Sequence, residues 1–299
     1  MDKKIKQCLV KWLNRGMNFF LCGCGVMVLW LLVQVFCLTS FHIPSDSMEP
    51  GLLSGDVILV NKWTYGARLF DVMKAVDGQQ VNIQRLPGIG KIKRNDVVVF
   101  NNPCPREWRK VEMDIMQYYV KRCVALPGDT FCIENGRYKV QGYEGKLGCI
   151  EAQDMFRRMV NEQGLTWYSS PLMKAFPGDS LVGWTALEFG PLYIPRLNDS
   201  IIMNVCTVNL YRDVIEWEQD KKLGCRDDGV YLGDSLIRNY RFLKNYYFMV
   251  GDKVENSKDS RYWGLLPEEY IVGKAWRVWK SVNMWTGDIR WNRIWKKIE

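Results

Sequence analysis

Histidine is almost absent from this chain: His42 is the only one among 299 residues. A serine hydrolase with the usual histidine base would have a single candidate for that role. No cysteine pair has metal-site spacing with histidine support, so we expect no metal and no other cofactor. Lysine is the alternative base for a serine nucleophile, and the sequence therefore directs attention to its lysines.

Charge is absent from residues 16–45, which contain no Asp, Glu, Lys or Arg. The centre of this segment, residues 17–39, holds about the 20 apolar residues that a helix needs to span a bilayer. The apolar run is too long for the core of a signal peptide, and no Ala-x-Ala site follows it. The sequence therefore predicts one transmembrane helix at residues 17–39.

The cations nearest to this segment all precede it. The next cation after it is Lys62, whereas five precede it: Lys3, Lys4, Lys6, Lys11 and Arg15. The positive-inside rule predicts a cytoplasmic basic N-terminus, residues 1–16, with everything from about residue 40 outside. The net charge of +8 comes with no basic motif or zinc-finger spacing, so we expect no nucleic-acid partner.

The remainder of the chain has the pattern of a β protein. Short apolar runs bounded by Gly, Pro and Asn predict strands at 56–60, 81–83, 96–100, 118–120 and 246–250. Asn135-Gly136 predicts a hairpin turn within 132–140, and residues 155–163 are compatible with a short helix. We expect a mostly β fold: the helix, then an exported antiparallel β-sheet catalytic core (40–130 and 246–299) split by an inserted second domain (131–245).

Two features leave alternatives open. Six cysteines on the expected outer side could form disulfides, but spacing does not reveal pairing: Cys104, Cys123, Cys132, Cys149, Cys206 and Cys225. The C-terminal segment interleaves Trp276, Trp279, Trp285, Trp291 and Trp295 with Arg277, Lys280, Arg290, Arg293, Lys296 and Lys297. This composition suits a bilayer interface; alternatively, the first two tryptophans are strand core and the last turn is a solvated basic tail.

Ser47 and Lys121 are the candidate reactive pair. Ser47 lies in the Pro-flanked turn 44–50, shortly after the apolar segment. A hydroxyl needs a base within hydrogen-bond reach, and a free lysine is neutral in only about one molecule in a few thousand at pH 7. Burial can lower a lysine pKa by up to about 3–5 units. The apolar neighbours Val120, Val124 and Leu126 would provide that burial.

Four segments occur in an order that resembles the successive motifs of bacterial type I signal peptidases. They are Phe41-His42-Ile43-Pro44-Ser45-Asp46-Ser47-Met48-Glu49-Pro50, residues 95–100, residues 121–129 and residues 251–264, which end in Ser257-Lys258-Asp259-Ser260-Arg261-Tyr262-Trp263-Gly264. Departures from the usual motifs are Gly51, Asn95, Ala125 and the triplet 253–255, none of which removes a proposed catalytic group.

The resemblance implies a role for each matching residue. Ser47 would be the nucleophile and Lys121 the general base, with the hydroxyl of Ser45 and the backbone N–H of Ser47 as the oxyanion hole. Ser257 would orient the lysine, and Asp259 with Arg261 would form a structural ion pair beneath the site. Shallow pockets for the small side chains of an Ala-x-Ala site would be lined by Phe41, Ile43, Met48, Leu52, Tyr119 and Val120.

The resemblance implies a single-pass protein of the bacterial inner membrane with its catalytic domain on the outer face. Its partners would be the lipid bilayer and the signal peptides of exported preproteins, which it would remove. The alternative is a membrane-anchored β protein that binds signal peptides without cleaving them. The presence of both Ser47 and Lys121 argues against that alternative.

Overall fold

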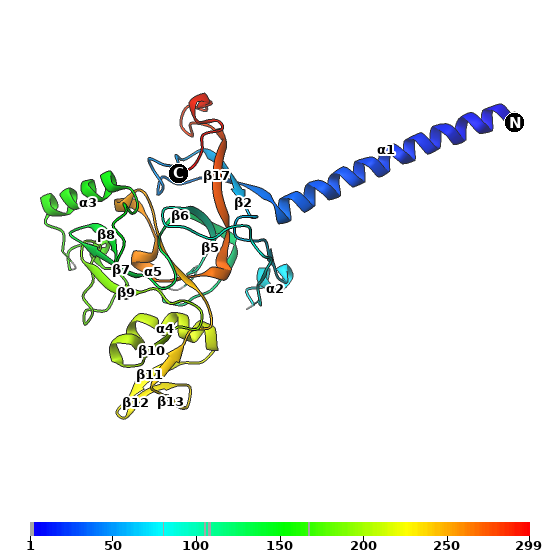
Figure 1. The fold of residues 1–299 in the computed structure, drawn as a ribbon. Helices are drawn as coiled ribbons and strands as arrows, with labels where there is room; N and C mark the ends of the chain where they lie inside the picture. Colours follow the sequence, from blue (N-terminus) through cyan, green and yellow to red (C-terminus); the bar gives the residue numbers. More distant parts are fainter. Residues whose placement is uncertain (1–2, 80, 105, 107–108, 167) are drawn as a thin grey trace.

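The computed structural model describes residues 3–79, 81–104, 106, 109–166 and 168–299. Helix α1 (Lys3–Phe36) projects away from a β-rich body (Figure 1). Its part Lys11–Phe36 is long and apolar enough to cross a membrane, by length and composition, and is not buried against the body. The helix predicted to reach residue 39 is wrong at that end, because Leu38 and Thr39 pair with Asn61 and Val60 in a sheet.

Strands from both ends of the chain form the main sheet, and every described pairing in it is antiparallel. Its order is β1-β2-β17-β5-β6-β15-β16. The bounds are β1 Leu38–His42, β2 Asp56–Asn61, β5 Val97–Asn102, β6 Asp114–Ala125, β15 Tyr246–Val250, β16 Leu266–Pro267 and β17 Ile271–Ser281. The expected mostly β fold with antiparallel sheets is therefore confirmed.

Smaller elements flank this sheet (Figure 1). One sheet joins β8 (Arg137–Val140), β7 (Thr130–Glu134) and β9 (Phe189–Tyr193); the others are β10 (Ser200–Ile202) with β14 (Asn239–Arg241), β11–β13 (Leu223–Arg226, Gly229–Leu232, Ser235–Ile237), and β3 (Arg68–Leu69) with β4 (Gln84–Arg85). The helices are α2 (Val72–Val76), α3 (Ile150–Gln163), α4 (Val205–Gln219) and α5 (Ser260–Trp263). One apolar cluster contains Phe100, Phe131 and Phe248, so the sheets share a core. The division into a core and an inserted domain stays a prediction.

Local predictions fared unequally. The hairpin turn at Asn135-Gly136 is present, with both residues at positive φ. Residues 81–83 do not form a strand, because an apolar run with no strand to pair with makes no inter-strand hydrogen bonds. The helix predicted at 155–163 begins earlier, at Ile150. Helix α4 was not predicted, although Asn204 and Thr207 form a capping box at its start.

The possible disulfides are not formed among the cysteines whose side chains the structure describes, all of which are free thiols. Cys123 is buried in the sheet core, whereas Cys206 and Cys225 are exposed on other elements. Positions this different do not bring sulfur atoms together.

Candidate active site

The turn that carries Ser47 connects β1 to β2 and is held in place by buried apolar side chains. Met48 and Leu52 are fully buried in an apolar cluster with the inner faces of β2 and β5. Backbone bonds from Leu52 N to Met48 O (2.8 Å) and from Gly55 N to Ile43 O (2.8 Å) close the loop. Ser47 itself stays half-buried, with its side chain available at the edge of the sheet.

Lys121 reaches Ser47 from the neighbouring part of the sheet. It lies on β6, opposite Val98 of β5, and only 4% of the residue is exposed. Its Nζ donates a hydrogen bond of 2.6 Å to Ser47 Oγ. Burial lowers the pKa of Lys121 to about 8, against the opposing charge of Asp259 and with a smaller contribution from Arg261.

Ser257 lies close to the pair, but not as expected. Its Oγ is buried and has no hydrogen-bond partner among the described residues, so the expected bond to Lys121 is absent; Nζ is directed to Ser47 instead. Gly251 explains how close the segments are: a Cβ added there would lie 2.1 Å from Ser257 Oγ and 2.6 Å from the carbonyl oxygen of Ser47. Only glycine fits between these two serines.

Asp259 and Arg261 form an ion pair whose side chains are both fully buried. Arg261 Nε and Nη2 each donate to a different carboxylate oxygen of Asp259 at 2.8 Å. Asp259 also accepts from Gly251 N at 2.9 Å, and Arg261 Nη2 donates to Val254 O at 2.9 Å. The pair thus holds together the segment that packs against Ser47.

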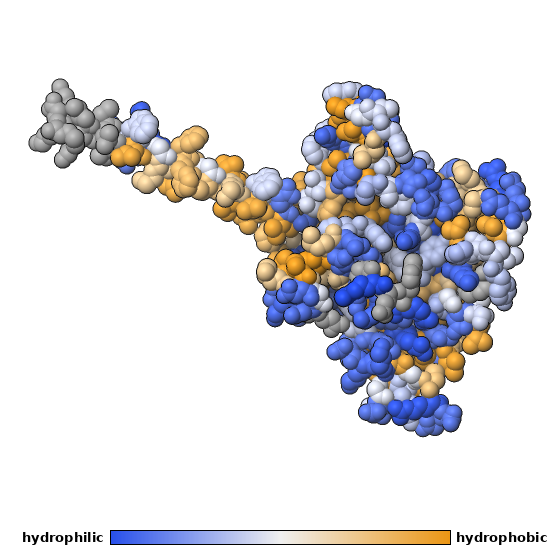
Figure 2. Space-filling model, turned by 180° about the vertical axis from the view of Figure 1, so that it is seen from behind, coloured by the Kyte–Doolittle hydropathy of each residue, from blue (hydrophilic) through white to orange (hydrophobic). Residues whose placement is uncertain are grey.

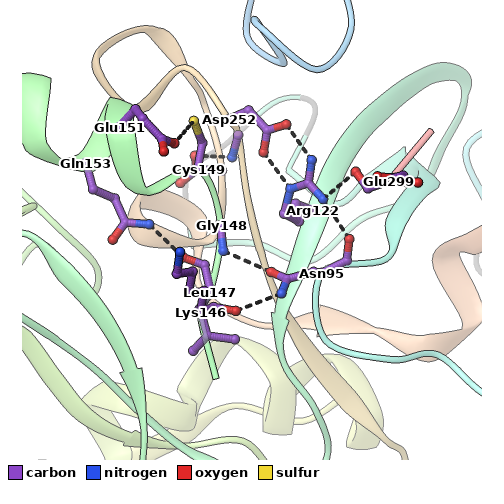
Figure 3. Close-up of polar contacts among 12 residues, drawn as sticks. Asn95, Arg122, Lys146, Leu147, Gly148, Cys149, Glu151, Gln153, Asp252 and Glu299 are labelled. Carbon is purple, nitrogen blue, oxygen red and sulfur yellow. Dashed lines mark hydrogen bonds and ion pairs between the residues drawn. The ribbon is translucent and has the colours of Figure 1, made fainter. Parts of the chain in front are cut away.

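A second ion pair holds the same segment from the other face of β6 (Figure 3). Arg122 follows Lys121, and alternation along a strand directs the two side chains to opposite faces. Arg122 binds both carboxylate oxygens of Asp252 at 2.7 Å and donates to Asn95 O at 2.8 Å. Asn95 in turn binds the backbone of Gly148. The segment 251–252 is therefore fastened to β6 beside Lys121.

A cavity of about 400 Å³ opens at Ser47 and Lys121. Of the expected pocket residues it is lined by Phe41, Ile43, Met48, Tyr119 and Val120. Leu52 does not line it, because that side chain lies wholly in the apolar cluster under the turn. Ser45 is exposed at the rim, with its Oγ 3.5 Å from Ser47 Oγ. The volume is within the range of about 300–1,000 Å³ that is typical of ligand pockets.

Comparison with known proteins agrees with this geometry. Residues 16–172 and 209–279 match the family described as "Signal peptidase, peptidase S26". The chain belongs to this family. The matched residues include both Ser47 and Lys121.

Several curated relatives of this S26 peptidase are named signal peptidase I. The protein of Buchnera aphidicola subsp. Schizaphis graminum is 29% identical over 286 residues, which cover 88% of this chain and 76% of the relative. That of Pseudomonas aeruginosa is 30% identical over 276 residues (89% and 72%). That of Helicobacter pylori strain J99 is 24% identical over 314 residues (97% and 96%).

Sequence reasoning missed several residues of this peptidase site. The cavity is also lined by His42, Pro44, Asp46, Tyr118, Asn256 and Lys258. All six are direct sequence neighbours of predicted residues, and all but Tyr118 lie within the segments that resemble family motifs. The pair Arg122–Asp252 was also missed, although both residues lie within these segments. Membership of a motif segment was therefore the available signal.

Proposed function

We propose that this chain is a membrane-anchored serine endopeptidase that removes N-terminal signal peptides from exported preproteins, with Ser47 as nucleophile and Lys121 as general base. The observation that carries the proposal is the 2.6 Å contact between Lys121 Nζ and Ser47 Oγ. A buried lysine whose pKa is about 8 is neutral in about one molecule in ten at pH 7, which is enough for a base.

The proposed reaction proceeds through an acyl-enzyme. Neutral Lys121 takes the hydroxyl proton of Ser47 as Oγ bonds to the carbonyl carbon of the substrate. The negative charge on the carbonyl oxygen would be stabilised by the backbone N–H of Ser47 and the hydroxyl of Ser45. The ammonium of Lys121 then returns its proton to the leaving amine as the C–N bond breaks. Water, deprotonated by Lys121, hydrolyses the resulting ester and restores Ser47.

The cavity supports a preference for small side chains, as in an Ala-x-Ala site. Bulky neighbours such as Phe41, Tyr119 and Met48 occupy its walls. Small substrate side chains would fit between these walls, whereas a large aromatic side chain would compete with them for space.

The membrane part of the proposal rests on α1. Figure 2 shows apolar residues along this helix and at its junction with the body. Ser47 can lie no further than roughly 40 Å from the end of α1 at Phe36, since an extended chain spans at most about 3.6 Å per residue. With five basic residues in the first part of α1, up to Arg15, and the next one after its apolar part only at Lys62, we propose a cytoplasmic N-terminus and a catalytic body on the outer face of the bacterial inner membrane.

Cleavage by the purified full chain in detergent tests the proposal. A preprotein with an Ala-x-Ala site should be cut once after that site. Ser47→Ala and Lys121→Ala should each abolish cleavage, and the double variant should lose no more than either, because nucleophile and base act as one unit. His42→Ala should keep most of the activity. Binding of the preprotein without cleavage by the wild type would favour the alternative, a signal-peptide-binding protein.

We also propose that the C-terminal tryptophan segment contacts the outer face of the membrane that α1 spans. Fewer of its residues are available for this contact than the composition indicated. Trp285 and Trp291 are 96% and 74% exposed. Arg293, by contrast, is buried in an ion pair with Asp56, whereas Lys296 and Lys297 are exposed. Trp276 is 39% exposed on β17 and so is not core.

Fluorescence of the full chain in vesicles tests this contact. Lipids brominated near the headgroup quench tryptophans that reach the interface, so Trp285→Phe should remove part of the quenching. Trp184→Phe, which changes a half-buried tryptophan packed on Phe189, is the matched control and should remove none. Equal quenching in wild type and Trp285→Phe would contradict the contact.

A further inference from the structure

The residue between the two serines of the site is held by side chains from a distant part of the chain. Asp46 lies between Ser45 and Ser47, and its carboxylate accepts from Lys253 Nζ. It also accepts from Asn256 Nδ2, at 2.9 and 3.2 Å for its two oxygens. We name Asp46, Lys253 and Asn256 the Asp46 clasp.

The backbone adds a further link at the same place. Lys253 N donates to the carbonyl oxygen of Ser47 at 3.1 Å. Within the turn itself, Glu49 N donates to Asp46 O at 2.9 Å. Lys253 Nζ also lies 3.5 Å from Glu49 Oε2. One residue, Lys253, thus contacts the turn through both its backbone and its side chain.

The clasp is better placed to affect reactivity than stability. The side chains of Asp46 and Lys253 are 35% and 28% exposed, and ion pairs this exposed contribute little to folding. The hydrogen bond from Lys253 holds the pKa of Asp46 below its ordinary value, so the carboxylate stays charged at neutral pH. The buried pairs Asp259–Arg261 and Arg122–Asp252 already fasten the 251–261 segment. The clasp instead fastens the turn to that segment.

We propose that the Asp46 clasp is a positioning device that fixes the Ser45 hydroxyl and the Ser47 backbone N–H relative to each other, so that both point at the developing oxyanion. This inference rests on the proposed function of Ser47 and Lys121. Donors to an oxyanion act because they are arranged before the reaction. A displacement of about 1 Å can cost roughly a hundredfold in rate. Because Asp46 joins the two donors in the chain, restraint of this residue acts on both of them.

Kinetics of the full chain in detergent with a signal-peptide substrate test the clasp. Lys253→Met keeps the aliphatic stem and removes the charge. We expect kcat to fall by about tenfold to a hundredfold, with KM changed less than about twofold and the urea midpoint unchanged. Lys139→Met is the matched control: it removes the cation of another surface ion pair, Lys139–Glu134. It should leave kcat unchanged. Wild-type kcat in Lys253→Met would overturn the inference.

Charge reversal separates positioning from a general structural effect. Asp46→Lys and Lys253→Asp should each lower kcat, and the double variant should recover at least about tenfold over the worse single variant, because the pair is restored with its signs exchanged. Failure to recover, or losses of kcat that follow losses of urea stability, would overturn the inference. If Ser47→Ala still cleaves, the proposed function itself fails. If Ser47→Ala is inactive while the clasp variants are not impaired, the clasp alone fails.

Discussion

Replacing Lys121 by methionine should abolish cleavage and at the same time stabilise the folded protein near neutral pH. Burial lowers the pKa of Lys121 from 10.5 to about 8, so the folded protein at pH 7 holds an ammonium where the charge is disfavoured. The unfolded chain carries the same proton without that penalty. Between about pH 8 and 10.5 the unfolded state keeps the proton and the folded state does not, so stability rises with pH in this window.

The pKa also sets the size of the effect. Relative to a protein with a side chain that does not titrate at this position, the free energy of unfolding of the wild type should rise by about 2 kcal/mol between pH 7 and pH 9.5. The stability advantage of Lys121→Met should shrink by the same amount over that range. Urea unfolding of both proteins at the two pH values measures the difference, in which the other titrating groups cancel. A stability difference that does not change with pH would refute the buried-ammonium argument.

The activity of the wild type should follow the same group. In the free enzyme, kcat/KM should rise with pH on an apparent pKa near 8, because only neutral Lys121 acts as the base. At pH 7 the neutral fraction would be about one in eleven, compared with about one in three thousand for a lysine with its ordinary pKa. An activity limb at or above pH 10 would show that Lys121 keeps its ordinary pKa in the working enzyme.

Two further substitutions test the packing around the site. Gly251→Ala should abolish cleavage, because its Cβ would lie 2.1 Å from Ser257 Oγ; Gly224→Ala, where nothing lies within 4 Å, should retain it in the same peptide assay. Arg293→Met should lower the free energy of unfolding by about 3–5 kcal/mol, since it leaves the Asp56 carboxylate buried without its cation. Unfolding in urea within about 1 kcal/mol of wild type would contradict the second expectation.

The sequence predicts the members of the site better than their contacts. Ser47 and Lys121 are separated by 74 positions, and no local pattern joins them; the resemblance of whole motifs does. Strands such as β2 and β5 were predictable because their apolar runs lie between turn residues. The end of α1 was not, because Leu38 is as apolar as the helix before it and only its pairing with β2 shows that it is a strand.

Ion pairs over long separations were beyond sequence reasoning. Arg122 and Asp252 are 130 positions apart, and Arg293 and Asp56 are 237 apart. With 41 Lys and Arg and 33 Asp and Glu in the chain, charge alone does not select partners. Arg293 shows the consequence: the sequence left open whether it faces a bilayer or belongs to a solvated tail, whereas the fold buries it against the loop that follows Ser47.

The junction between α1 and the body bears directly on how the proposed enzyme meets its substrate. Lys62 Nζ donates to the carbonyl oxygens of Gln34 (2.7 Å) and Val35 (3.2 Å), which a helix end leaves without partners. Lys62 N also donates to Cys37 O at 2.9 Å. A single residue, Cys37, separates α1 from β1. Lys62, which directly follows β2, holds the end of α1, and β2 itself pairs with β1. If α1 lies in the bilayer as proposed, these bonds restrain the distance between the membrane surface and the turn that carries Ser47.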